Sequence, residues 1–414
     1  QQMLGYVARA REAFGATRRG ETLSILARGS TQALIIFAIG HGLNFLVQIA
    51  LARWMGVSEY GAYASVINWV TLLTAVASFG LDASVLRFVP QYIATRAYAA
   101  AHGYIRWAYG VTLVSSLFVA IAASGFILLI SGGRPGLGQT TMMIGIWSVP
   151  ASAMIDFQTG LGRAYRRVIL AYTPSRILRH VIIFLGVVLL VLAGAGETSR
   201  NLVIMNVAFL SMLALGQWWQ LNRVEPSAIS VAPPAYDARE WTRVAIPLLG
   251  ITLFLDLIRR TDILMISGLM DSASVGEYTV ATRIAGLVTF FQMAVNGMAT
   301  PMISAAHTEG NKRRMQHVFT IAAHITFWPT LLLAVALAVL SGQLLRLFGP
   351  GFADARTPLL ILLAAQLVNA SCGLVGSALA MTGRERDSLR VYATCAGLNI
   401  VAVYAGIRVA GING

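Results

Sequence analysis

Residues 107–130 read WAYGVTLVSSLFVAIAASGFILLI, a stretch that contains no charged side chain. An apolar run of roughly 20 residues is long enough to cross the hydrocarbon core of a bilayer as an α-helix. A membrane β-strand would instead alternate apolar and polar residues, and this stretch does not. It therefore predicts a membrane-spanning helix.

The same pattern recurs along the chain. Of its 414 residues, 57% are hydrophobic and 12% are charged, and the mean hydropathy is +0.70. Soluble domains carry about 25% charged residues. We predict an all-α membrane protein with eleven spans, at residues 31–52, 60–81, 107–130, 139–162, 177–195, 201–221, 244–270, 278–303, 318–345, 357–382 and 391–407.

The net charge of +14 lies mainly between the spans. Most of the 31 Lys and Arg residues fall in, or at the ends of, every second connecting segment, beginning with residues 1–30. The other connections hold six arginines: Arg53, Arg134, Arg200, Arg346, Arg356 and Arg408. The positive-inside rule then places the N-terminus in the cytoplasm. Because this distribution accounts for the basic charge, no nucleic-acid partner is expected.

The two ends of the chain carry separate expectations. Residues 1–30 are Arg-rich and do not resemble a cleavable signal peptide, so they predict either an amphipathic helix on the inner leaflet or a disordered basic tail. The first residue is Gln1, which places the expected start upstream. Cys372 and Cys395 both lie inside apolar runs, so neither a disulfide framework nor a cysteine metal site is expected.

An internal repeat divides the chain in two. Gly61-Ala62-Tyr63 corresponds to Gly276-Glu277-Tyr278 at an offset of 215 residues, and Gly162-Arg163 corresponds to Gly383-Arg384 at an offset of 221. The offset maps spans one to four onto spans seven to ten. We therefore predict two pseudo-symmetric lobes of six helices each, with eleven helices present and the twelfth expected beyond Gly414.

The repeat also sets the domain boundaries. We predict a cytoplasmic N-terminal segment at 1–30, an N-lobe at 31–222, a cytoplasmic linker at 223–243 and a C-lobe at 244–414. An even number of spans in each half inserts both halves the same way up, with the pseudo-twofold axis along the membrane normal. Equivalent residues should then face one another across the midline.

Charged residues inside the seventh span indicate where a site lies. Asp256, Arg259 and Arg260 share one face of this helix. A charge at the bilayer centre costs about 2.5–3.5 kcal/mol on insertion scales, so such residues usually face a protein interior or a watery cavity. Two interpretations remain open: the charges neutralise one another, or they line a cavity.

The offset of 215 extends this pattern to the first lobe. It relates Asp256 and Arg259 to His41 and Asn44, which form a polar stripe with Gln48 on the first span. It also relates Arg283 to Asn68. Chance is one explanation, because these helices carry scattered polar residues. The other is a central cavity that is polar on both walls and more cationic on the second.

Asp156 in the fourth span is a second intramembrane carboxylate. It is a candidate, with Asp256, for coupling transport to a proton or another ion, and a hydrogen-bonded structural carboxylate is the alternative.

Several motifs are missing from the sequence. It contains no Walker P-loop, no His-Glu-x-x-His and no Gly-x-Ser-x-Gly, so we expect no cofactor and no metal. The short connections leave no room for an ATPase or a soluble catalytic domain. Energy for transport must then come from a gradient, from the membrane potential or from the substrate itself.

Short motifs in both halves resemble one transporter family. In the first half they are RWMGVSEYGAY (53–63), FGLD (79–82) and Arg87-Phe88, and in the second VGEY (275–278), LFGPGF (347–352) and TGR (382–384). Together they resemble the polysaccharide-biosynthesis flippases. These are the Wzx-type O-antigen flippases of the multidrug/oligosaccharidyl-lipid/polysaccharide exporter superfamily.

The resemblance implies a transporter rather than an enzyme, in the bacterial inner membrane. It implies alternating access that carries an undecaprenyl-pyrophosphate-linked oligosaccharide from the inner to the outer leaflet. By analogy, Arg259 and Arg283 hold the headgroup, and His41, Asn44, Gln48 and Asn68 lie nearer the sugars. Membrane lipids, the glycan polymerase and glycosyltransferases are the partners that it implies.

Three rival functions remain at this point. They are another exporter of the superfamily that carries drugs or a different lipid-linked precursor, a membrane-embedded glycan polymerase or ligase, and a non-transporting scaffold. A polymerase or ligase would normally need a large outer loop, and a scaffold leaves the buried charges unexplained. The sugar identity, the coupling ion and the oligomeric state do not follow from the sequence.

Overall fold

The computed structural model describes residues 2–192, 194, 196, 198–292, 295–296, 299, 302–303, 311–372 and 385–414, with the backbone alone for residues 2–31, 33–34 and 385–389. Within these residues every regular element is a helix. The Gly383-Arg384 repeat motif and the 304–310 part of a predicted loop lie outside the described residues.

The helices of the N-terminal half are α1 (Gln2–Ala77), α2 (Leu81–Ala94), α3 (Tyr98–Ile130), α4 (Leu137–Ile146), α5 (Val149–Ala164), α6 (Val168–Thr173), η1 (Pro174–Leu178), α7 (Arg179–Leu192), α8 (Ser199–Val224) and α9 (Ser227–Ser230). Those of the C-terminal half are α10 (Ala238–Leu269), α11 (Ser272–Ala285), η2 (Gly286–Val288), α13 (Lys312–Val339), α14 (Ser341–Phe348), η3 (Pro350–Ala355), α15 (Arg356–Cys372), α17 (Glu385–Ala410) and η4 (Gly411–Asn413).

The chain turns back on itself at Gly56, inside α1. This glycine has φ 73° and ψ 176°, a conformation that residues with a Cβ rarely adopt. The two limbs of α1 then pack together. The Tyr60 hydroxyl on the second limb donates a 2.8 Å hydrogen bond to Oε1 of Gln48 on the first. Predicted spans one and two are therefore the two limbs of α1. We call this end of the molecule the Gly56 end.

Eight helices in the described part of the chain are long and apolar enough to cross a membrane. The predicted spans that are not counted separately are present as merged or shorter elements. Span 60–81 is mostly the second limb of α1, span 139–162 is divided between α4 and α5, and span 278–303 begins with α11 and η2. The all-α, multi-pass architecture predicted from the sequence is confirmed.

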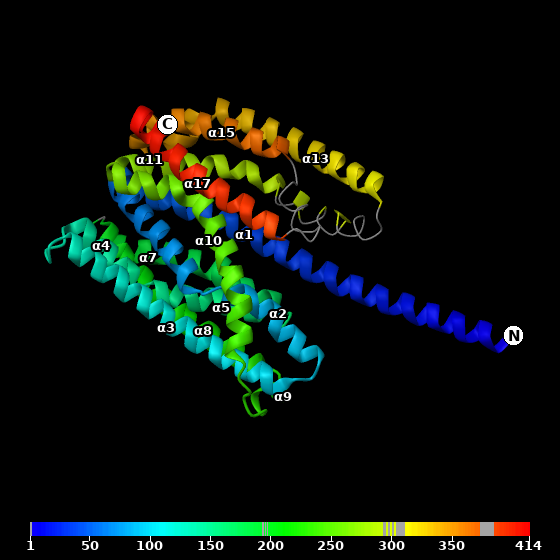
Figure 1. Ribbon diagram of the computed structural model, residues 1–414. Helices are drawn as coiled ribbons and strands as arrows, with labels where there is room; N and C mark the ends of the chain where they lie inside the picture. The colour runs from blue at the N-terminus through cyan, green and yellow to red at the C-terminus, as the bar shows by residue number, and fades with distance from the viewer. Residues whose placement is uncertain are drawn as a thin grey trace.

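The helices form two lobes (Figure 1). Helices α3, α4, α5, α7 and α8 lie together on one side, and α11, α13 and α15 lie on the other. Near the Gly56 end, the lobes share a hydrophobic core that contains Leu51, Tyr60, Val280, Phe348 and Phe352. A second core, built from α2, α3, α5 and the start of α10, lies toward the opposite end and includes Phe88, Tyr104, Phe157 and Trp241.

The predicted two-fold relation appears in one contact between the lobes. A Cβ at Gly61 would collide with the carbonyl oxygen of Ser272 and lie 2.7 Å from the amide nitrogen of Gly276. A Cβ at Gly276 would collide with the carbonyl oxygen of Val57 and lie 3.3 Å from the amide nitrogen of Gly61. The two contacts are equivalent under the repeat, because Val57 and Ser272 are 215 residues apart and so are Gly61 and Gly276. The second limb of α1 and α11 thus cross backbone to backbone.

Candidate functional site

A cavity of about 360 Å³ lies between the two lobes, and we call it the arginine cavity. Both limbs of α1, together with α10, α11 and η2, enclose it. Its lining consists of His41, Asn44, Phe45, Asn68, Arg259, Arg260, Ile263, Thr279, Thr282, Arg283, Gly286 and Leu287. Five of the six predicted substrate-binding residues are therefore brought to one cavity, and Gln48 is the exception.

Local capping sets where the helices that carry Arg259 and Arg283 begin. The carboxylate of Asp237 accepts the backbone N–H of Glu240 (3.2 Å) at the start of α10, and that of Asp271 accepts from Ser274 at the start of α11. The Ser274 hydroxyl bond (2.5 Å) lowers the pKa of Asp271, which keeps this cap charged. A charged carboxylate at a helix N-terminus stabilises the helix. Arg283 then lies on the last turn of α11.

Arg260 is held on both sides. Its guanidinium donates a 3.0 Å hydrogen bond to Oδ1 of Asn68, from the other lobe, and its Nε lies 3.8 Å from Oδ1 of Asp256 on the previous turn of α10. Asn68 is buried, and its amide donates to the carbonyl of Ala64 (2.9 Å). The contact between Arg260 and Asn68 joins the lobes. The internal repeat did not predict it, because the offset of 215 residues relates Asn68 to Arg283.

The first limb of α1 presents a hydrogen-bonded polar chain. The amide of Gln48 donates to Oδ1 of Asn44 (3.5 Å), and its oxygen accepts from the buried Tyr60 hydroxyl. Arg283 lies within interaction range of the same hydroxyl. His41 bonds through Nδ1 to the carbonyl of Phe37 (2.8 Å). Gln48 therefore reaches the arginine cavity through Asn44 rather than by lining it.

The arginine cavity carries more positive than negative charge. Asp256 forms an ion pair with Arg260, and within the described part of the chain no carboxylate pairs with Arg259 or Arg283. Thr279 adds an unused hydrogen-bonding group, since the residue is 2% exposed and its hydroxyl has no partner. Buried polar groups without partners are uncommon. The cavity can therefore accept an anionic ligand.

A second, smaller cavity of about 240 Å³ lies beside α10, and we call it the carboxylate cavity. It contains both predicted coupling residues, Asp156 from α5 and Asp256 from α10, with Asp82 and Arg163. Four hydroxyl side chains complete its polar lining: Thr71 from α1, Ser78 just after α1, Thr159 from α5 and Thr252 from α10. Asp256 thus faces this cavity, while Arg259 and Arg260 face the arginine cavity.

Sequence reasoning missed several of these residues. Asp82 stood in a family-like motif at the end of a span, and a carboxylate in that position was the available signal. Thr279 and Thr282 carried no signal, because threonine is common in membrane helices. No group of three His, Cys, Asp or Glu side chains in the described ranges is close enough to hold a metal ion.

Two family models match the chain. The model described as polysaccharide biosynthesis protein matches residues 26–307, and the model described as MatE matches residues 247–405. No curated protein sequence matches the chain.

Solved structures share the fold at low sequence identity. A structure described as lipid II flippase MurJ in an inward closed conformation has a TM-score of 0.72 at 16% identity, covering 92% of this chain and 83% of that one. An inward-facing multidrug resistance MATE family transporter has a TM-score of 0.66 at 14% identity, covering 91% and 96%. An outward-facing one has a TM-score of 0.61 at 16% identity, covering 93% and 92%. At these identities the likeness establishes the fold.

Proposed function

Because the chain belongs to the polysaccharide biosynthesis protein family, within a superfamily of membrane exporters and flippases, we propose that it flips an undecaprenyl-pyrophosphate-linked oligosaccharide across the membrane. The cargo, an O-antigen or exopolysaccharide unit, moves from the inner to the outer leaflet by alternating access. The observation that carries this proposal is the unpaired positive charge of Arg259 and Arg283 in a cavity between the lobes.

The chemistry of the cavity suits a pyrophosphate. Arginine presents a planar fork of N–H donors that meets phosphate oxygens in pairs, and such charge-assisted bonds are stronger away from bulk water. In the proposed complex Arg259 and Arg283 hold the two phosphates, and Thr279 donates its free hydroxyl. Arg260 already donates a hydrogen bond to Asn68 and forms an ion pair with Asp256, so it supports the site from the α10 side.

The first lobe supplies the groups proposed to lie nearer the sugars. His41, Asn44 and Asn68 line the α1 side of the cavity, and Gln48 holds the amide of Asn44 in place. Side-chain amides donate and accept hydrogen bonds, as sugar hydroxyls require. The headgroup and the first sugars would therefore contact opposite lobes.

Asp156 and Asp256 are proposed to couple flipping to a cation, and the structure adds Asp82 beside them. Three carboxylates face one arginine in the carboxylate cavity, so taking up a proton or a monovalent cation would reduce the excess negative charge. The pair between Asp256 and Arg260 links this cavity to the arginine cavity. If the carboxylates couple transport, Asp156→Asn should abolish the acceleration of flipping by an imposed proton or sodium gradient; a purely structural Asp156 would leave that acceleration intact.

Drug export is the second candidate function, and the MatE match to residues 247–405 is what favours it. A cationic drug would be repelled by the surplus charge of the arginine cavity, whereas an anionic lipid-linked precursor would be attracted. We therefore place the lipid-linked cargo first. The bacterial inner membrane, a cytoplasmic N-terminus, and the glycan polymerase and glycosyltransferases as partners belong to the same proposal.

The proposal is tested by flipping in reconstituted vesicles. We expect Arg283→Ala to abolish translocation of the pyrophosphate-linked glycan while the protein still inserts normally. Arg283→Lys should restore part of it, because lysine keeps the charge but loses the planar fork. Arg134→Ala removes an exposed arginine between α3 and α4 and serves as the matched control. Full activity of the Arg283→Ala protein would rule out this role for the cavity.

A further inference from the structure

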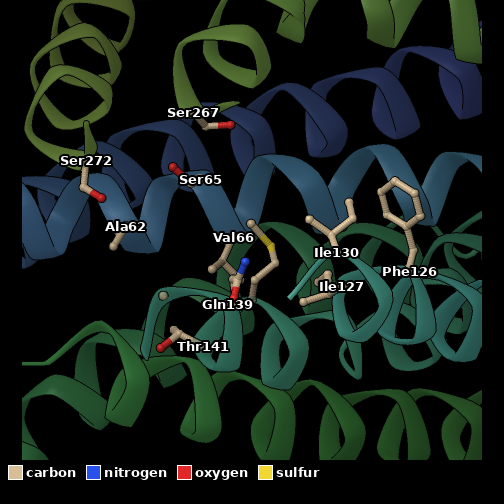
Figure 2. A pocket seen from close by; sticks show the side chains of 12 residues that line it. Ala62, Ser65, Val66, Phe126, Ile127, Ile130, Gln139, Thr141, Ser267 and Ser272 are labelled. Atoms are coloured by element: carbon tan, nitrogen blue, oxygen red, sulfur yellow. The ribbon is translucent and has the colours of Figure 1, made fainter. Parts of the chain in front are cut away.

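A groove on the surface of the N-lobe extends to the seam between the lobes, and it shares no lining residue with either cavity. Its apolar part, about 460 Å³, lies between the second limb of α1, α3 and α4, where Trp69, Phe118 and Phe126 line it. Its other part, about 380 Å³, shares Phe126, Ile127 and Met142 with the first and adds polar residues. Figure 2 shows Phe126 and Ile130 toward one side of this part, and Ser65, Ser267 and Ser272 toward the other.

The floor of the apolar part is made of small residues between aromatic ones. Phe118, Ala122 and Phe126 are spaced by four residues on α3, so they lie on one face of the helix. Phe118 and Phe126 are 71% and 62% exposed, and the small side chain at 122 leaves a trough between them. The trough is lined by apolar side chains, which suits a hydrocarbon chain.

The groove and the arginine cavity are separated by a thin wall. Asn68 lines the cavity and the next residue, Trp69, lines the groove. On α10, Ile263 lines the cavity and Ser267, one turn later, lines the groove. The wall is closed by the bond from Trp69 Nε1 to the Ser267 hydroxyl (3.0 Å) and the bond from Arg260 to Asn68 (3.0 Å).

We propose that this groove holds the isoprenoid chain of the cargo while the pyrophosphate occupies the arginine cavity, with the lipid linkage crossing the wall at the Trp69–Ser267 contact. The inference rests on the proposed function. An ordinary phospholipid gains little from such a groove, because lipid tails are as apolar as the groove itself. A chain attached to a bound headgroup is different, since the attachment makes its binding to the groove intramolecular.

The groove therefore distinguishes a lipid-linked cargo from a water-soluble one. Its polar part offers hydroxyl and amide groups near the proposed crossing point, from Ser65, Gln139 and Ser267. The Trp69–Ser267 bond is a single neutral hydrogen bond, so separating these two side chains costs only about 1 kcal/mol. Opening the wall at this point breaks this bond, and the Arg260–Asn68 bond beside it must also break or shift.

Photolabelling tests the inference in vesicles of phosphatidylethanolamine and phosphatidylglycerol. One probe is undecaprenyl pyrophosphate with a diazirine on the chain, and the other is undecaprenol with the same diazirine. We expect the first probe to label the Phe118–Ile127 segment at least about tenfold more than the second, because the anchored headgroup raises the local concentration of the chain. Arg283→Ala should reduce labelling by the first probe to the level of the second.

A blocking variant supplies the second measurement. Ala122→Trp fills the trough and should lower both flipping and groove labelling, whereas Ala336→Trp, on an exposed position of α13, should change neither. Equal labelling by both probes, with flipping still dependent on Arg283, would show only annular lipid in the groove and overturn the inference while leaving the proposed function intact. Loss of flipping dependence on Arg283 would instead overturn the proposed function itself.

Discussion

At the scale of single residues, the arginine cavity holds groups that the fold leaves without partners. Burying a hydroxyl without a hydrogen bond costs roughly 1–3 kcal/mol in proteins, so such a group lowers stability unless a ligand uses it. Thr279 is such a group, because its hydroxyl is buried at the cavity wall and has no partner. Arg259 and Arg283 are similar in that no described carboxylate neutralises them.

Thr279→Val is therefore expected to have opposite effects on stability and on transport. Valine keeps the shape and removes the unpartnered hydroxyl, so the thermal unfolding temperature in detergent should stay the same or rise. Loss of a bond to a charged phosphate, worth about 1.5–3 kcal/mol, should weaken cargo binding by roughly ten- to a hundredfold. Melting curves and flipping rates of the same preparation check both effects, and a lower melting temperature would indicate a structural hydroxyl.

At the scale of elements, α10 belongs to both lobes. Its first turns lie in the core of the N-lobe, where Trp241 is fully buried. The indole donates to the Tyr92 hydroxyl (2.9 Å) and contacts Tyr104 edge-on with ring centroids 5.3 Å apart. Pro247, just beyond, removes one backbone hydrogen bond from the helix. The predicted boundary at residue 244 thus falls within a helix that fastens the C-lobe to the N-lobe.

Trp241→Ala tests this anchoring role. Removal of a buried tryptophan costs about 3–5 kcal/mol, so we expect a large fall in the stability of the N-lobe. Trp241→Phe should retain most of the packing and lose only the bond to Tyr92. Limited proteolysis of the connection at 225–237 measures the effect, with Trp218→Ala on the exposed side of α8 as the control. Unchanged protease resistance of Trp241→Ala would contradict the assignment.

At the scale of the whole molecule, the lobes meet through equivalent backbone at the Gly56 end. Gly61 and Gly276 let α1 and α11 approach until backbone touches backbone, which no residue with a Cβ allows. The two contacts are related by the repeat, so separating the lobes at this end breaks both together. We interpret the structure as closed at the Gly56 end, the end proposed to face outward.

Gly276→Leu should therefore shift the protein away from this state. Nitroxide labels at Ser58 and Ala273, near the contact on each lobe, are expected to move apart in the variant when measured by electron paramagnetic resonance. Gly110→Leu is the control, because a Cβ at position 110 meets nothing within 4 Å. Closely spaced labels in Gly276→Leu, as in the parent protein, would show that the contact does not hold this end closed.

The orientation of the whole molecule is tested by cysteine accessibility. In a variant with Cys372 and Cys395 replaced by serine, Arg167→Cys and Lys312→Cys should react only from the cytoplasmic side. Arg134→Cys should react with a membrane-impermeant maleimide added to intact cells, because the positive-inside rule places these loops on opposite faces. Reaction of Arg167→Cys from outside would reverse the proposed orientation.

The sequence alone determined the membrane-spanning helices, the two-lobe repeat and the helices that carry buried charge. These follow from the length of apolar runs, from loop charge and from a fixed offset, all of which are properties of the chain itself. It also identified His41, Asn44, Asn68, Arg259 and Arg283, which line one cavity, although their roles stay predictions.

Only the tertiary structure decided which groups meet. Arg260, rather than Arg283, donates a hydrogen bond to Asn68. Asp256 lines a cavity with Asp82 and Asp156, and the hydroxyl of Thr279 has no partner. The tertiary structure also opened a groove beside Trp69 that no motif indicates. The physical reason is that side-chain contacts between helices depend on the rotation and crossing of each helix, which packing sets and periodicity does not.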